Sequence, residues 1–87
     1  MNYLVVVFNS RNDTMQFYNI IKKYNTYCSI VNTPRLLTRS CGISVKIATG
    51  SVELAKNIIS SSKFDSFKGI YQLSSQPHLT TQPIRVY

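Results

Sequence analysis

The segment Tyr3-Leu4-Val5-Val6-Val7-Phe8 is the stretch from which the fold of this chain can be worked out. Its β-branched and aromatic residues run without a polar interruption, which is typical of a central strand covered on both faces. The remaining segments are therefore expected to pair with this strand or to pack over it.

Two amphipathic helices are predicted to supply that cover. In residues 13–24 the apolar side chains recur at helical spacing, and Asn25 is expected to stop the helix. Asp13 at the start of this segment complements the helix dipole. The second helix opens with Ser51 as the expected N-cap. Its apolar stripe consists of Val52, Ala55, Ile58 and Ile59.

Three further strands complete the pattern. Residues 27–32 form the second strand, and Pro34 marks its exit because proline cannot continue a paired interior strand. Residues 43–47 alternate between apolar and polar side chains, as a strand with one buried face does. Residues 68–73 form the last strand. The loop before it is expected to be held on the core by two aromatic residues, Phe64 and Phe67.

The order β-α-β-β-α-β predicts an α+β, ferredoxin-like fold: a four-stranded antiparallel sheet with two helices on one face. Right-handed crossovers place the first and third strands side by side at the centre. We expect a single domain over residues 1–73 and a polar, flexible tail over residues 74–87. An extra strand within residues 83–87 is the alternative for that tail.

Net charge and the length of the apolar runs restrict the partners and the location expected for this chain. Ten basic and three acidic residues give a net charge of +7, which favours acidic partners, but the basic residues are scattered and are expected to form solvated surface. No apolar run approaches the roughly 20 residues of a membrane span, and the segment from Leu4 to Phe8 is too short for a signal peptide. We therefore expect a cytoplasmic protein with reduced thiols and no membrane contact.

The chemistry is concentrated in residues 34–42, Pro-Arg-Leu-Leu-Thr-Arg-Ser-Cys-Gly. Positive charge on Arg35 and Arg39 favours the thiolate of Cys41, the nucleophilic form of cysteine. Backbone N–H groups around Gly42 would add positive potential. The pattern predicts a reactive Cys41. An inert loop cysteine, with Gly42 only relieving backbone strain, is the alternative.

Cys28 is expected to have a different role. If residues 34–42 join the second and third strands as a hairpin, Asn32 faces Ile43 and Cys28 lies opposite Ile47. Five residues of strand span about 16 Å, whereas the Cα atoms of bridged cysteines lie within about 7 Å. An intrachain disulfide is therefore disfavoured, and Cys28 is expected to be a small hydrophobic residue of the core.

The chain resembles the putative selenium/sulfur carrier protein-like family over residue 1 to about residue 73. The resemblance rests on the first strand, on Pro34-Arg35, on Ser40-Cys41-Gly42 entering a strand, and on Gly69-Ile70-Tyr71. Arg39 departs from the small or acidic residue expected there, and the tail looks like an addition to the family pattern.

What the resemblance implies is a carrier that holds sulfur or selenium on Cys41, as a persulfide or selenosulfide, for delivery to a partner enzyme. Donor and acceptor proteins would be its partners. No cofactor or metal is expected, and the protein would be a carrier and not a stand-alone enzyme. The choice between sulfur and selenium stays open.

Two other classes of function stay open. The first is an interaction or regulatory module, in which the open face of the sheet pairs with a second copy or another protein. The second is a single-stranded RNA module with Tyr3, Tyr27 or Tyr71 as stacking faces. Nucleic acid is the less expected partner, because the signature of the RNA-recognition domain is missing and the tyrosines are expected to pack in the core or at the sheet edge.

Enzyme classes that depend on other motifs find no support. Gly50 lacks the neighbouring glycines of a phosphate loop. Asp13, Glu53 and Asp65 lie on separate segments and suggest no acid–base pair. The lone His78 and the two distant cysteines do not form a zinc-ligand pattern.

Overall fold

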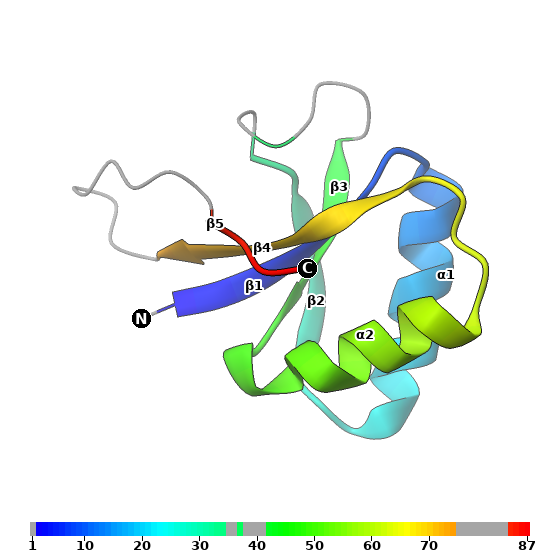
Figure 1. Ribbon diagram of the computed structural model, residues 1–87, viewed down its shortest axis with the longest axis horizontal. Coiled ribbons are helices and arrows are strands. Elements are labelled where there is room, and N and C mark those ends of the chain that lie inside the picture. Colours follow the sequence, from blue (N-terminus) through cyan, green and yellow to red (C-terminus); the bar gives the residue numbers. More distant parts are fainter. Residues whose placement is uncertain (1, 35–36, 38–41, 75–83) are drawn as a thin grey trace.

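The computed structural model describes residues 2–34, 37, 42–74 and 84–87 (Figure 1). In these residues two α-helices and five strands follow one another as β1 (Asn2–Phe8), α1 (Arg11–Ile21), β2 (Cys28–Asn32), β3 (Ile43–Ile47), α2 (Val52–Ser61), β4 (Phe67–Ser74) and β5 (Ile84–Arg85). One 3-10 turn, Lys22–Tyr24, extends α1, and another, Thr49–Ser51, leads into α2.

The strands form one antiparallel sheet in the order β2-β3-β1-β4-β5. The predicted α+β class with an antiparallel sheet is confirmed, and β1 and β3 are neighbours, as expected from right-handed crossovers. The predicted number of four strands is wrong, because β5 adds a fifth strand beyond β4. The order of the first four strands is compatible with a ferredoxin-like arrangement.

The central strand β1 is buried on both faces, as its sequence predicts. Leu4, Val6 and Phe8 belong to the main core cluster, whereas Val5 and Val7 alternate with them and point to the opposite face. Val5 and Val7 are nevertheless only 1% and 0% exposed. The centre of the second face is therefore covered within a single chain.

Both helices pack on the face of the sheet that carries the core cluster (Figure 1). Phe17 and Ile21 come from α1, and Ala55 and Ile58 come from α2. Burying an apolar side chain of the size of Phe or Ile contributes about 1.5–3 kcal/mol, so these stripes hold the helices on the sheet. No helix in the described part of the chain is long and apolar enough to cross a membrane.

The ends of the helices differ in detail from the sequence prediction. Helix α1 begins at Arg11, earlier than expected, because Ser10 is the N-cap and its side chain accepts a hydrogen bond from the Asp13 backbone N–H. Asn25 ends the helical region in a left-handed conformation, with a φ of 58°, as the sequence predicted.

The start of α2 differs from the prediction. Ser51 precedes α2 but its side chain does not cap the helix, because its hydroxyl is hydrogen-bonded to Thr26 Oγ1 instead.

Phenylalanine rings close one end of the core. Phe8 lies 5.2 Å from Phe64 and 5.7 Å from Phe67, measured between ring centroids, which is the usual range for aromatic pairs. These two rings hold the segment after α2 against the core, as predicted. Phe67 does so from the first position of β4 and not from a loop.

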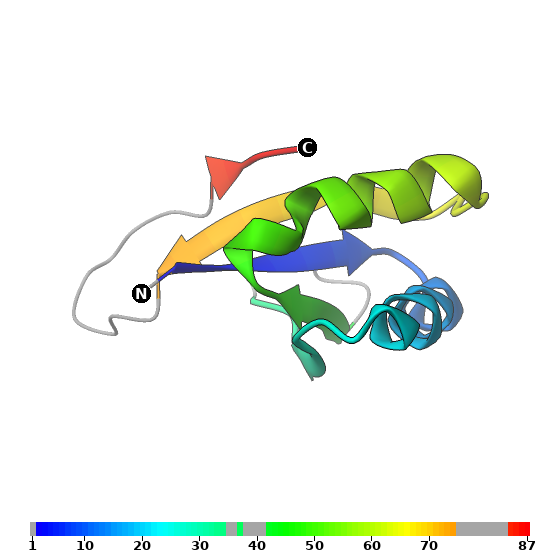
Figure 2. The same cartoon turned by 90° about the horizontal axis from the view of Figure 1, so that it is seen from below.

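The C-terminal residues lie along the outer edge of β4 and near α2 (Figure 2). Val86 N–H donates to the Ile70 carbonyl at 2.8 Å, and the centroid of the Tyr87 ring lies 5.8 Å from that of Phe67.

Gly69 leaves room for this C-terminal segment. A Cβ atom added at Gly69 would lie 3.0 Å from Arg85 Nε and 3.2 Å from the Tyr87 carbonyl oxygen. The φ angle of Gly69, 154°, also favours glycine over residues with a side chain.

Candidate functional site

The β2–β3 hairpin carries the predicted thiol loop at its open end. Asn32 pairs with Ile43 and Cys28 with Ile47, so the predicted register is confirmed.

Thr33, the residue after the last pair of the hairpin, forms hydrogen bonds with Gly42 and Ser44. Thr33 N–H donates to the Gly42 carbonyl at 3.0 Å. The hydroxyls of Thr33 and the buried Ser44 share a hydrogen bond of 2.5 Å. Both ends of the connection are thus fixed to each other and to the sheet.

Most of the predicted site falls in the connection itself. Arg35, Arg39, Ser40 and Cys41 lie outside the described residues, so the reactivity of Cys41 and the role of the arginines stay predictions. Within the described residues, Leu37 N–H donates to the carbonyl of Pro34 at 2.9 Å, which forms a turn after β2.

Gly42 is the one predicted site residue that the structure describes. It is exposed, its φ is outside the left-handed region, and an added Cβ would meet no described atom within 4 Å. The described residues thus show no positive φ and no close contact that would require a glycine here, and both interpretations of Gly42 stay predictions.

Cys28 matches its predicted structural role. It is a free, half-buried thiol whose side chain packs against the core cluster. Burial raises the pKa of the Cys28 thiol above its usual value, and the charge of Lys22 acts in the opposite direction. A raised pKa keeps the thiol protonated and weakly nucleophilic at neutral pH.

Two of the three acidic side chains make polar contacts within the described part of the chain. Asp13 Oδ2 accepts hydrogen bonds from the Ser66 backbone N–H at 3.2 Å and from its hydroxyl at 2.6 Å, which ties α1 to the loop before β4. Glu53 pairs with Lys56 at 3.7 Å on α2. Asp65 is exposed. Among the described residues no group of His, Cys, Asp and Glu could hold a metal ion.

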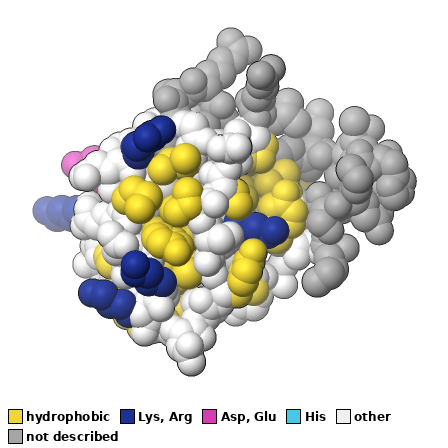
Figure 3. Space-filling view, turned by 180° about the vertical axis from the view of Figure 1, so that it is seen from behind, with side chains coloured by type: hydrophobic (Ala, Val, Ile, Leu, Met, Phe, Trp, Pro, Cys, Tyr) yellow, Lys and Arg dark blue, Asp and Glu magenta, His cyan; other side chains and the backbone are white. Residues whose placement is uncertain are grey.

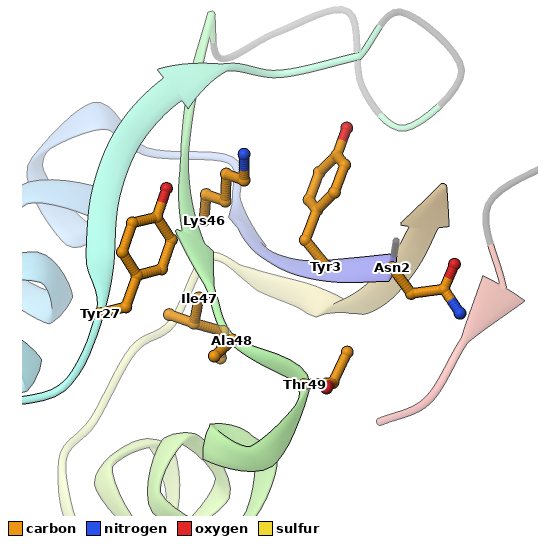
Figure 4. A pocket seen from close by; sticks show the side chains of 7 residues that line it. All are labelled: Asn2, Tyr3, Tyr27, Lys46, Ile47, Ala48 and Thr49. Carbon is orange, nitrogen blue, oxygen red and sulfur yellow. The ribbon is translucent and has the colours of Figure 1, made fainter. Parts of the chain in front are cut away.

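Two of the tyrosines named as stacking faces, Tyr3 and Tyr27, lie at one surface pocket. Tyr27, just before β2, is 54% exposed, and it lines a pocket with Tyr3 and Lys46 (Figure 4). The Lys46 Nζ lies 4.5 Å from the centroid of the Tyr3 ring. The alternation in residues 43–47 placed Lys46 away from the core, but the sequence did not reveal its partner, which depends on how β1 and β3 align.

The surface around these residues mixes apolar and basic side chains. The face seen in Figure 3 carries hydrophobic side chains with Lys and Arg side chains spread among them. On this face the described basic side chains do not form one block.

A family model described as "Putative Se/S carrier protein-like" matches residues 3–72. This chain belongs to that family. The match begins in β1, includes the whole connection between β2 and β3, and ends within β4. No curated protein and no solved structure matches the chain.

Membership of the Se/S carrier-like family confirms the resemblance seen in the sequence. The matched region contains both helices, β2, β3, all of β1 except its first residue, and all the residues of the predicted thiol site. The match leaves out β5, so the strand that pairs with the edge of β4 lies beyond the matched residues.

Proposed function

We propose that the protein carries sulfur or selenium on Cys41 and delivers it to a partner enzyme. The observation that carries this proposal is the family match over residues 3–72, which spans the loop with its single cysteine. The hairpin supports it, because the paired strands hold Pro34 and Gly42 at one end of the sheet. A loop on a rigid scaffold is suited to meeting a partner protein.

The transfer needs no cofactor. The Cys41 thiolate attacks the terminal sulfur of a donor persulfide, a bond forms between the two sulfur atoms, and the donor leaves as a thiolate with the electron pair of the broken S–S bond. An acceptor nucleophile then attacks the terminal sulfur and releases the Cys41 thiolate. Selenium would follow the same sequence as a selenosulfide.

Arg35 and Arg39 are proposed to stabilise the thiolate and the anionic persulfide of Cys41. Ser40 and Gly42 would contribute the backbone of the loop. In a Cys28→Ala background, which leaves one thiol, Arg35→Gln and Arg39→Gln should each shift the pH midpoint of Cys41 alkylation upward. Lys23→Gln, an exposed charge change at the end of α1, should leave it unchanged.

The carrier role itself is tested by delivery. Protein loaded by a persulfide donor and separated from it should lose its extra sulfur to a thiol acceptor, with recovery of free Cys41. Loaded protein that keeps its sulfur in the presence of excess acceptor would argue against a carrier. A cytoplasmic location and specific donor and acceptor proteins belong to the same proposal.

The main alternative is an interaction module that pairs through the open sheet face. Val5 and Val7, at the centre of that face, are buried within the single chain, whereas Tyr3 on the same face of β1 is half-buried. The two valines therefore offer no exposed surface to a second copy, and the family match favours the carrier proposal.

A further inference from the structure

A pocket of about 430 Å³ lies at the end of the β2–β3 hairpin opposite to the thiol loop (Figure 4). Its walls include Tyr3 from β1, Lys46 from β3 and Tyr27 just before β2, with Asn2 and Thr49 at its margin. The volume is within the range of small-molecule sites, about 300–1,000 Å³. The proposed carrier function makes no use of this pocket.

The aromatic part of the pocket offers a face for stacking. Tyr27 is 54% exposed although it is a large side chain, so one face of its ring is accessible to a ligand. The Lys46 ammonium lies 4.5 Å from the centroid of the Tyr3 ring, a distance at which a cation–π interaction favours this arrangement of the two side chains. Tyr27 is therefore the accessible platform, and Lys46 is a positioned cation beside it.

The polar ends of three side chains point the same way. In Figure 4 the Lys46 Nζ lies between Tyr3 and Tyr27, and the two phenolic hydroxyls point to the same side as the ammonium. Hydroxyl and ammonium groups all donate hydrogen bonds, and an ammonium favours an anionic acceptor. The Tyr27 hydroxyl lies 3.5 Å from the Ser29 hydroxyl and can donate to a ligand while it accepts from Ser29. These groups suit an anionic group of a ligand whose ring lies on Tyr27.

Among the described residues, no carboxylate is paired with the ammonium of Lys46. The chain contains three acidic side chains, and none of them lines the pocket. Glu53 pairs with Lys56, and Asp13 accepts hydrogen bonds from Ser66. With a net charge of +7 over the whole chain, an anion in this pocket would be favoured by the general field as well as by Lys46.

We propose that this pocket binds a nucleotide unit, with the base stacked on Tyr27 and the phosphate held by Lys46 and the tyrosine hydroxyls. The amide of Asn2 and the hydroxyl of Thr49 would be available to the base or the ribose. The same chemistry describes a free mononucleotide and one unit of a single RNA strand. This inference revises the sequence-based view that nucleic acid is the less expected partner.

The test is a calorimetric titration of the intact chain at low salt with adenosine monophosphate, adenosine, inorganic phosphate and a short oligoadenylate. Adenosine monophosphate should bind at least about 10-fold more tightly than adenosine, because a charged hydrogen bond is lost without the phosphate. Inorganic phosphate should bind still more weakly, because it cannot stack. If oligoadenylate binds and adenosine monophosphate does not, the source is an RNA strand.

Matched variants locate the binding. Tyr27→Ala and Lys46→Met should each weaken binding by about 10-fold or more, through loss of stacking or of the charged contact. Tyr24→Ala, which removes another exposed ring, and Lys23→Met, which removes another exposed charge, should leave the affinity unchanged. Because Tyr27 is exposed, Tyr27→Ala is expected to leave folding intact. This variant therefore tests the pocket even if Lys46→Met affects folding.

Two results would overturn the proposal. One is the absence of binding by both adenosine monophosphate and oligoadenylate at low salt. The other is an affinity that Tyr27→Ala leaves unchanged, or that the two control variants reduce as much as the pocket variants do. Cys41→Ser should bind like the wild type, so failure of the carrier proposal would not affect this outcome.

Discussion

Cys28 shows how one position in a strand sets the chemistry of a side chain. It lies opposite Ile47 and packs against the core cluster, so forming its thiolate would place a charge in a partly desolvated site. Burial therefore raises its pKa, although Lys22 opposes the shift. In the protonated form Cys28 is a poor competitor for a sulfur donor, which leaves Cys41 as the candidate thiol.

The raised pKa makes a prediction about stability. Because the folded state holds the Cys28 proton more tightly than the unfolded state, this contribution is complete below the ordinary thiol pKa of about 8.5 and is lost as the pH rises through the folded value. Urea unfolding at about pH 7 and about pH 10 should show a larger loss of stability for the wild type than for Cys28→Ala. The same pH dependence in both proteins would contradict the assignment.

Asp13 makes a second prediction at the residue scale. Its carboxylate accepts two hydrogen bonds from Ser66, which lies 53 positions along the chain and is half-buried. Asp13→Ala should reduce the free energy of unfolding by about 1–3 kcal/mol, because the Ser66 donors lose their acceptor.

Asp65→Ala is the matched control for this measurement. It removes the same charge from an exposed position, so its effect on urea unfolding should stay within about 0.5 kcal/mol. Equal effects of the two substitutions would indicate that the charge, and not the hydrogen bonds to Ser66, accounts for the loss.

At the scale of elements, β5 depends on a glycine in its neighbour. Gly69 has a left-handed φ of 154°, and its missing side chain leaves room for Arg85 and the Tyr87 carbonyl. Gly69→Ala should cost about 1–3 kcal/mol of stability through backbone strain. It should also speed hydrogen exchange at the Val86 amide, which donates to the Ile70 carbonyl. Unchanged stability and exchange would contradict this account of Gly69.

Gly50→Ala is the control for the same experiment. Gly50 does not have a positive φ, and an added Cβ would meet no described atom within 4 Å. Alanine is also the better residue for a helical turn, so this variant should be as stable as the wild type or slightly more stable.

The local sequence pattern predicted the strands better than the side-chain contacts between distant segments. The continuous apolar run of β1 and the alternation in β3 fixed those strands closely, because burial and side-chain period act over neighbouring residues. The pairing of Cys28 with Ile47 also followed from the hairpin. The contact of Asp13 with Ser66 and that of Lys46 with Tyr3 join distant segments, and no local pattern encodes such contacts.

The strand β5 was predicted only as an alternative, for a physical reason. Its two residues are exposed, so they lack the buried side-chain pattern by which a strand is recognised. They pair with Tyr71 and Gln72 of β4. The two residues after them add backbone hydrogen bonds with Ile70 and the contact of the Tyr87 ring with Phe67. The space that Gly69 provides for them can be understood only once the two segments are seen side by side.

On the scale of the whole molecule, the β2–β3 hairpin separates two candidate sites. The thiol loop joins Asn32 to Ile43, and the tyrosine–lysine pocket lies by Ile47 and Tyr27 at the other end. Residues 34–42 were recognised from their chemistry alone, because a cysteine among arginines is visible in the sequence. The pocket was not, since its three main side chains come from separate segments.

The measurement that tests the central claim most directly is intact-mass analysis after treatment with a persulfide donor. Wild type and Cys28→Ser should each gain one sulfur atom, and Cys41→Ser should gain none. No addition to the wild type, or the same addition in Cys41→Ser as in the wild type, would contradict the assignment of Cys41 as the carrier thiol.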